Sequence, residues 1–255
     1  MKNNRLRKID FFKVFLRSFF MQSVWNYRSL ISVGFEVCLI PIVKRLYPDY
    51  QSRKEFLLRH LKFFNSHPYM ASYALGVSMK LEEEIATGNP DIAPQLEKVK
   101  ELMTGPLGRK GDQLFWLTIK PFSLIIGVLG LFVFDSAGVK VAVLAISFLI
   151  YNIPHFYLRY VGLVEGYEYG LNVYKRINVN WFDKLRRIYL YTGIAAFSIF
   201  FLMLVWHLFE ESQAQLIVLI LAGLYAGLTY KLSRKFYFTI FFTLVLFIIV
   251  GFLLF

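Results

Sequence analysis

Hydrophobic and polar positions follow one another along this chain in blocks, and the longest apolar blocks lie in the C-terminal half. A helix needs about 20 apolar residues to cross a bilayer, and five runs there approach or exceed that length: 114–134, 141–164, 188–209, 214–230 and 236–255. The sequence therefore predicts about five transmembrane helices. Lys120-Pro121 predicts a kink in the first of them.

The N-terminal half has shorter apolar stretches with helical spacing. Residues 9–25 combine an aromatic face with a basic edge, typical of a helix at the lipid headgroups or of one packed on a partner. Residues 31–43 are too few to cross a bilayer and contain Glu36 and Pro41, so we expect a re-entrant or broken helix. Residues 44–64 are polar and basic, with apolar side chains at 3.6-residue spacing that predict an amphipathic helix.

Two further helices are predicted before the first long apolar run. The helix after Pro68 has one apolar stripe, with Lys80 and Glu84 four residues apart on its polar side. A short helix over residues 93–103 is expected to stop at Gly105-Pro106.

These elements predict an all-α, polytopic membrane protein with re-entrant or broken helices in the N-terminal half and about five clear transmembrane spans. Residues 1–113 would form an amphipathic arm and broken-helix region and residues 114–255 the transmembrane region, together making one integrated membrane domain. Composition agrees, since 57% of the residues are hydrophobic and the mean hydropathy is +0.50, more apolar than an ordinary soluble domain.

The net charge of +12 is distributed in short basic clusters between the apolar runs. Loops at 175–187 and 231–235 are basic like the N-terminal region, whereas those at 135–140 and 210–213 are poor in Lys and Arg. The positive-inside rule then predicts a cytoplasmic N-terminus and an external C-terminus, with membrane lipid as the counter-charge. No soluble basic-aromatic module is present, so nucleic-acid binding is not expected.

Catalytic signatures are missing from the sequence. Cys38 is its only cysteine, which excludes an internal disulfide and a cysteine-based metal site. It contains no Gly-Lys-Ser/Thr phosphate loop, no Ser-His-Asp set and no His-Glu-x-x-His pair. We therefore predict no catalytic residue, no metal and no cofactor.

Three segments carry a resemblance to a known family. They are RSFFMQSVWNYRSLISVGFEVCLIPIVKRLYP, then RHLKFFNSHPYMASYALGVSMKLEEE, then GPLGRKGDQLFW. In this order and spacing the chain resembles the IID subunit of the mannose/fructose/sorbose family of the sugar phosphotransferase system over roughly residues 10–175. The family's loop after GPL reads something like AGIGDS, whereas this chain has GRKGDQ, with two cations and with Gln113 replacing the serine.

The resemblance implies a function and a set of partners. It implies a subunit of the bacterial cytoplasmic (inner) membrane that forms a sugar path with a IIC partner. Cytoplasmic IIA and IIB proteins would carry the phosphoryl group, and the IID subunit itself would be neither phosphorylated nor catalytic. The alternative is a regulatory or scaffolding IID-like protein that recruits IIB without transporting sugar.

Asn65 and His67 flank the helix start at Pro68 and are candidate substrate-binding residues. An amide and an imidazole at a helix break can form hydrogen bonds with sugar hydroxyls. The alternative for Asn65, or for Ser66, is that it caps the following helix.

Three carboxylates complete the candidate substrate site: Glu36, Glu82 and Asp112. Glu36 lies inside an apolar run, where an ionisable group suggests function. Glu82 follows the apolar stripe of its helix most closely and could line the interior, whereas Glu83 and Glu84 are expected on a solvated face. Asp112 precedes the first span and could instead be its N-cap.

Arg109 and Lys110 lie among three glycines, 105, 108 and 111, in a segment expected to form a tight turn or a backbone anion nest. The charge rule places them near the cytoplasmic face. Two cations there must reach the interface or an anion, so they are candidate contacts for lipid or for the phosphorylated partner.

Overall fold

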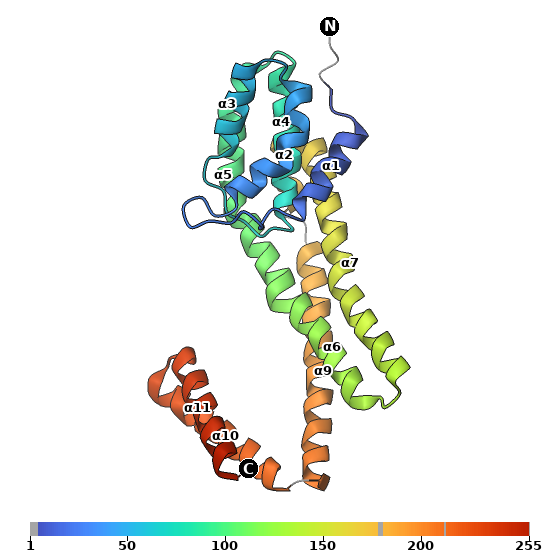
Figure 1. Cartoon of the computed structure of the whole chain (residues 1–255), viewed down its shortest axis with the longest axis vertical. Helices are drawn as coiled ribbons and strands as arrows, with labels where there is room; N and C mark the ends of the chain where they lie inside the picture. The colour runs from blue at the N-terminus through green and yellow to red at the C-terminus, as the bar shows by residue number, and fades with distance from the viewer. Residues whose placement is uncertain (1–4, 178–180, 212, 255) are drawn as a thin grey trace. The chain divides into compact units, whose positions relative to one another are not determined.

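The computed structural model describes residues 5–177, 181–211 and 213–254. The elements named in these residues are all helices, joined by turns and short loops (Figure 1). The α-helices are α1 (Lys8–Ser18), α2 (Ser32–Leu46), α3 (Tyr50–His60), α4 (Ala71–Ala86), α5 (Ala93–Gly111), α6 (Lys120–Val133), α7 (Ala137–Tyr169), α8 (Tyr174–Ile177), α9 (Trp181–Glu211), α10 (Gln213–Ser233) and α11 (Phe236–Leu254). Two 3-10 segments, η1 (Pro90–Ile92) and η3 (Gly170–Asn172), and one π-helix, η2 (Asp112–Ile119), complete the order.

The chain forms two compact units that divide between Ile194 and Ala195, inside α9. In the second unit α10 and α11 pack on each other as a hairpin. They are joined at Arg234, whose positive φ of 53° makes the tight reversal. The predicted division into residues 1–113 and 114–255 concerns which part lies in the membrane, and it stays a prediction.

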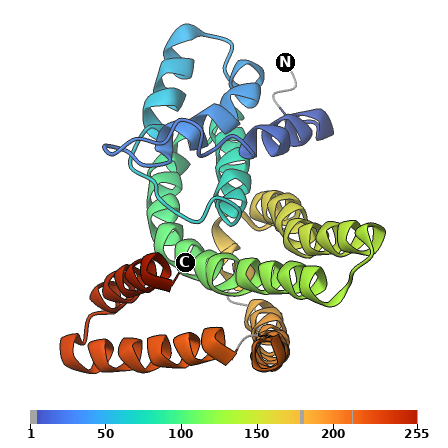
Figure 2. The ribbon, with the colours of Figure 1, turned by 60° about the horizontal axis from the view of Figure 1, so that its bottom comes forward.

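Helix α4 is the centre of the first unit. Its residues are buried almost all round, and it packs on α7 and also contacts α2 and α5. Figures 1 and 2 show α2, α3 and α5 gathered around α4, with α6 and α7 running side by side as a hairpin. The predicted pair on the polar side of α4 is present, with Lys80 Nζ 3.4 Å from Glu84 Oε1.

Glycines let α4 and α7 approach each other closely. A Cβ atom on Gly76 would lie 2.2 Å from the carbonyl oxygen of Leu163, and one on Gly166 would lie 2.2 Å from that of Tyr73. Small residues at helix interfaces are the common means of close packing in membrane proteins. The two helices therefore meet backbone against backbone.

The prediction that Gly105-Pro106 ends a short helix was wrong. Helix α5 runs from Ala93 to Gly111 and passes through η2 into α6 without a break. Gly105 and Pro106 lie on the exposed side of α5, while Leu107 on another side is fully buried. Packing of the buried side therefore outweighs the weak helix propensity of Gly and Pro.

The kink predicted at Lys120-Pro121 stays a prediction, and directly before this pair the structure has the π-helix η2. The backbone N–H of Lys120 donates to the carbonyl of Phe115, and the hydroxyl of Thr118 donates to the carbonyl of Gln113 at 2.6 Å. Both bonds reach back five residues rather than four. Proline brings no N–H, so the hydrogen-bond register has room to shift just before it.

Several predicted boundaries shift in the structure. Helix α1 ends at Ser18. Helix α3 ends at His60, so Phe64, which was predicted to be part of a helix over residues 44–64, lies beyond the observed helix. Phe64 instead pairs with the start of α2, where its backbone N–H donates to Ser32 Oγ at 2.7 Å. Helix α2 continues through Pro41 for 15 residues, shorter than a membrane span.

Within the described residues, four helical runs are long and apolar enough to cross a membrane, and Phe236–Val250 is a shorter apolar helix. The four runs are Pro90–Val133, Ala137–Asn172, Tyr174–Glu210 and Gln213–Ser233. The predicted polytopic, all-α architecture is confirmed. Residues 178–180 of the predicted basic loop and Ser212 of the acidic turn lie outside the described residues.

Candidate functional site

The two most distinctive sequence segments, FFNSHP and GPLGRKGDQ, lie against each other. Gly108 on α5 faces Ser66, whose Cα would be 3.9 Å from a Cβ placed on the glycine. One turn on, a Cβ on Gly111 would come within 2.3 Å of the side chain of His67. The glycines predicted to make a turn or a nest are therefore helical, and they allow the loop between α3 and α4 to sit close against α5.

His67 is buried at this contact, with 2% of its surface exposed. Its ring stacks on Phe115 at 5.2 Å, and its Nδ1 accepts a hydrogen bond from the backbone N–H of Tyr69 at 3.3 Å. Burial lowers the pKa of His67 to about 3, with the charge of Arg159 adding to the effect. The ring is therefore neutral, with its proton on Nε2, and this N–H finds no acceptor among the described residues.

Asn65 lies two residues earlier and is exposed. The alternative role as a helix cap is not observed, because the N-cap of α4 is Met70 and no side chain caps it. The amide of Asn65 is therefore exposed to a ligand or partner, two residues before the buried His67.

A second buried histidine also contacts the ring of Tyr69. The ring of His155 stacks on that of Tyr69 at 3.8 Å, and its Nε2 accepts a hydrogen bond from Arg159 Nε at 2.7 Å. Arg159 also donates to the carbonyl of Ser18, which ties α7 to the end of α1. These residues were not predicted, although an Arg and a His within an apolar run are the signal that could have identified them.

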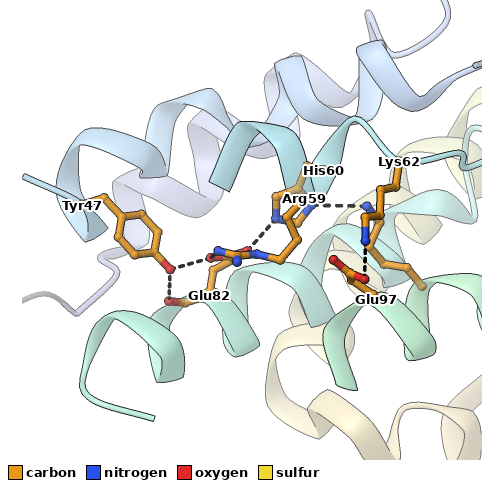
Figure 3. A network of polar contacts seen from close by, with 7 residues as sticks. Tyr47, Arg59, His60, Lys62, Glu82 and Glu97 are labelled. Carbon is orange, nitrogen blue, oxygen red and sulfur yellow. Dashed lines mark hydrogen bonds and ion pairs between the residues drawn. The ribbon is translucent and has the colours of Figure 1, made fainter. Parts of the chain in front are cut away.

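Glu82 on α4 is the hub of a separate buried network (Figure 3). Its Oε1 accepts hydrogen bonds from Arg59 Nε at 2.8 Å and from His60 Nε2 at 2.9 Å. Its Oε2 accepts from the hydroxyl of Tyr47 at 2.6 Å and from a second Arg59 nitrogen at 3.1 Å. Both carboxylate oxygens are engaged within the protein, so the geometry favours a positioning role that joins α2, α3 and α4.

The neighbours of His60 define its protonation state. Its Nε2 faces the Glu82 carboxylate, which can only accept a hydrogen bond. Its Nδ1 lies 3.4 Å from Lys100 Nζ, which can only donate one. Burial lowers the pKa of His60 to about 4. Burial would raise the pKa of Glu82, but the hydrogen bonds and charges of His60 and Arg59 outweigh it and lower that pKa to about 2.

These shifts predict a pH dependence of stability. Between pH 6.5 and about 4 the unfolded chain takes up a proton at His60 that the folded chain does not. Stability should therefore fall as the pH is lowered through this window, by at most ~3 kcal/mol from this residue. Thermal unfolding in detergent should show a smaller decrease between pH 6.5 and 4 in His60→Gln than in the wild type. Equal pH dependence in both proteins would contradict this assignment.

The remaining candidate carboxylates occupy different surroundings. Glu36 on α2 is 9% exposed, and burial raises its pKa while the charge of Lys100 lowers it, so Lys100 acts on both Glu36 and Glu82. Asp112 is exposed and continues the helix after α5, so its predicted N-cap role was wrong. The structure thus places Glu36 and Glu82 near the same lysine, Lys100. Asp112 directly follows Gly111, the residue that contacts His67.

Glu83 was predicted on a solvated face and is buried instead, with 8% of its surface exposed. Its Oε1 accepts a hydrogen bond from the backbone N–H of Leu6 at 2.5 Å, and its Oε2 accepts one from the hydroxyl of Tyr167. The reason for the difference is that α4 is covered on several sides at once. Glu83 faces the N-terminal arm and α7, while Glu82 faces α2 and α3.

Arg109 and Lys110 lie on α5 between Gly108 and Gly111, the two glycines that contact Ser66 and His67. Arg109 is exposed, whereas Lys110 Nζ lies 3.9 Å from the Asp183 carboxylate and 5.7 Å from the centre of the Phe182 ring. The pair therefore presents one exposed cation and one partly engaged cation.

Comparison with known proteins assigns this arrangement to a family. Residues 5–255 match the family described as the PTS system mannose/fructose/sorbose family IID component. The chain belongs to this family. The mannose-specific EIID component of Escherichia coli K12 is 33% identical over 182 residues, which cover 71% of this chain and 62% of that protein. The fructose permease IID component of Bacillus subtilis is 31% identical over 184 residues, covering 72% of this chain and 65% of its own length.

Two solved structures share the architecture. A structure titled as that of a membrane protein has a TM-score of 0.67 and 30% identity, covering 76% of this IID chain and 70% of its own. The complex of the mannose transporter ManYZ with microcin E492 gives a TM-score of 0.60 and 25% identity over 97% of this chain and 95% of the matched one. This IID component is thus a multi-pass protein of the bacterial inner membrane. Its alignments cover less than two thirds of either curated relative.

Proposed function

We propose that this chain forms, with a IIC membrane partner, the sugar translocation path of a mannose-family phosphotransferase permease. The observation that carries the proposal is the family match over residues 5–255. The similarity to ManYZ over 97% of the chain supports a shared membrane assembly. In this role the subunit carries no phosphoryl group; cytoplasmic IIA and IIB proteins supply it to the sugar.

Asn65 and His67 are the proposed sugar contacts of this subunit. An exposed amide and a buried N–H without a protein acceptor lie two residues apart, and sugar hydroxyls need such paired groups. Glu36 and Asp112 remain proposed lining carboxylates. Glu82 is proposed to act through the helices it joins rather than by touching the sugar.

Replacing Asn65 with alanine should weaken sugar binding or uptake by the complex while leaving its assembly intact. Losing one hydrogen bond to the bound sugar costs roughly 1–3 kcal/mol, or about 5- to 150-fold in affinity. Binding of radiolabelled sugar to the purified IIC–IID complex measures the effect. Asn89→Ala is the matched control, since Asn89 is also an exposed loop asparagine. Equal sugar affinity in the two variants would return Asn65 to a structural role.

The alternative function is a regulatory or scaffolding subunit that recruits IIB without passing sugar. The observation that favours it is the pair Arg109 and Lys110, at positions where the resemblance to the family leads us to expect small residues without charge. An exposed Arg109 fits docking of a phosphorylated protein or of anionic lipid. Sugar uptake in cells that express this chain with its IIC partner decides between the two functions, because a scaffold would support none.

The proposed orientation has a cytoplasmic N-terminus and an external C-terminus. In a Ser136→Cys variant the new thiol should react with an impermeant maleimide from outside the cell, whereas in Lys235→Cys it should react only after permeabilisation. Native Cys38 gives little background, because it is fully buried and burial raises the pKa of its thiol to about 12. Labelling of the Lys235→Cys variant in intact cells would reverse the topology.

A further inference from the structure

A groove runs between α1 and α7 in the first unit, and its lining residues differ from those of the His67 and Glu82 contacts described above. It has a volume of about 620 Å³, within the range of small-molecule sites. Its lining is Phe11, Phe12 and Phe15 from α1, Tyr160, Val164 and Tyr167 from α7, and the charged pair Lys8 and Glu168. The walls are therefore aromatic and aliphatic, and they carry one cation and one anion.

The groove is preformed, because α1 is fixed at both ends. At its start the backbone N–H of Leu6 donates to Glu83 on α4, and at its end Arg159 of α7 donates to the carbonyl of Ser18. Between these points the ring of Phe11 meets that of Tyr167 edge-on at 4.8 Å. A ligand would thus enter a fixed cleft and would not have to order the helix, which lowers the entropic cost of binding.

The groove lies along one of the apolar runs that can cross the membrane. Tyr160, Val164 and Glu168 follow each other at four-residue spacing on α7, inside the run Ala137–Asn172. Earlier on α7, Ile153 and Phe156 are exposed, at 60% and 46%. The apolar surface therefore extends toward the bilayer interior, while the charged pair marks the end of the run, where headgroups lie.

This distribution selects an amphipathic ligand. A sugar would find few free polar partners, because the Tyr167 hydroxyl is already bound to Glu83. An acyl chain fits the aromatic walls, and a headgroup with both charges fits Lys8 and Glu168 together. An anionic headgroup such as phosphatidylglycerol could place its phosphate beside Lys8, but it has no ammonium group and would leave the Glu168 carboxylate without a cationic partner.

We propose that the α1–α7 groove binds a zwitterionic phospholipid of the phosphatidylethanolamine type. One acyl chain lies against Phe12, Phe15 and Val164. The phosphate faces Lys8 and the ammonium group faces Glu168. The site is independent of the proposed sugar contacts, so it holds whether or not this chain transports sugar.

Native mass spectrometry of the full-length chain, alone and with its membrane partner, tests the proposal with phosphatidylethanolamine and phosphatidylglycerol as probes. The first lipid should bind with the higher affinity. Val164→Trp, which fills the groove, should weaken its binding about tenfold, whereas Ile153→Trp on the same helix should not. Lys8→Glu should weaken it about fivefold, and Lys13→Glu, an equal charge change on the exposed part of α1 outside the groove, should not.

A charge exchange makes the test independent of any damage to folding. Lys8→Glu combined with Glu168→Lys should restore phosphatidylethanolamine binding, because the pair is only inverted. The proposal is overturned if Val164→Trp and Ile153→Trp retain the lipid equally, or if phosphatidylglycerol binds as well as phosphatidylethanolamine. It is also overturned if Val164→Trp releases the membrane partner while lipid binding is unchanged, because the groove would then be a protein interface.

Discussion

Replacing Glu82 with alanine should lower the free energy of unfolding by about 3–5 kcal/mol, the usual cost of removing one partner from a buried ion pair. The carboxylate is fully buried and holds Arg59, His60 and Tyr47 from two other helices. Without it Arg59, only 13% exposed, keeps its charge without its carboxylate partner, close to the buried amine of Lys100. Reversible unfolding in mixed micelles measures the loss.

Glu84→Ala is the matched control for this change, two residues along the same helix. Glu84 pairs with Lys80 at 3.4 Å and is about one third exposed, so its loss should cost less than ~1 kcal/mol. Similar losses in the two variants would mean that the Glu82 network contributes no more than a surface ion pair. Glu82→Gln keeps the shape of the side chain and removes its charge. Its loss of unfolding free energy should lie between those of Glu82→Ala and Glu84→Ala.

Replacing Gly76 with alanine should destabilise the protein by about 3 kcal/mol or more. The added methyl would lie 2.2 Å from the backbone carbonyl of Leu163, so α4 and α7 must move apart. No side-chain rotation can relieve a clash with backbone. The same micelle unfolding experiment applies, and an unchanged free energy of unfolding in the variant would show that the helices are less tightly packed than described.

Gly105→Ala, in contrast, is expected to raise the free energy of unfolding. This glycine lies in α5 with no atom within 4 Å of the added methyl, so alanine should stabilise the helix by up to ~1 kcal/mol. The two variants make the same chemical change and differ only in their surroundings. If both destabilise, the exposed side of α5 is in contact with something in the measured assembly.

The sequence predicted the fold class well and the local geometry of the site less well. Long apolar runs identify membrane helices by length alone, and the Lys80–Glu84 pair followed from helical spacing. The helix end predicted at Gly105-Pro106 is absent because tertiary packing stabilises α5, and local helix propensity does not include that packing. The prediction that Glu83 is solvated was wrong because an amphipathic pattern presumes one solvated side of the helix, and α4 has almost none.

The partners of the predicted site residues could not be read from spacing. Glu82 reaches Tyr47 across 35 residues and Arg59 across 23, and no periodicity connects positions so far apart. Arg59 and His60 do adjoin each other at the end of one helix, and a buried glutamate elsewhere requires such a partner. The contact between Gly111 and His67 joins the GPLGRKGDQ and FFNSHP segments, each of which is distinctive in the sequence by itself.

Helices α5, η2 and α6 form one continuous helical segment, and the π-helix η2 determines how the side chains at its two ends are rotated relative to each other. A wide turn holds about one residue more than an α turn, so side chains beyond it are rotated by roughly 100° from where straight α-helical winding would put them. At one end of this segment Gly111 faces His67, and at the other a Cβ on Gly130 would meet Val143 of α7 at 2.1 Å. Both close approaches depend on that offset. A single-residue deletion within Asp112–Ile119 would therefore leave every contact residue in the sequence and still turn one of the two faces away from its neighbour.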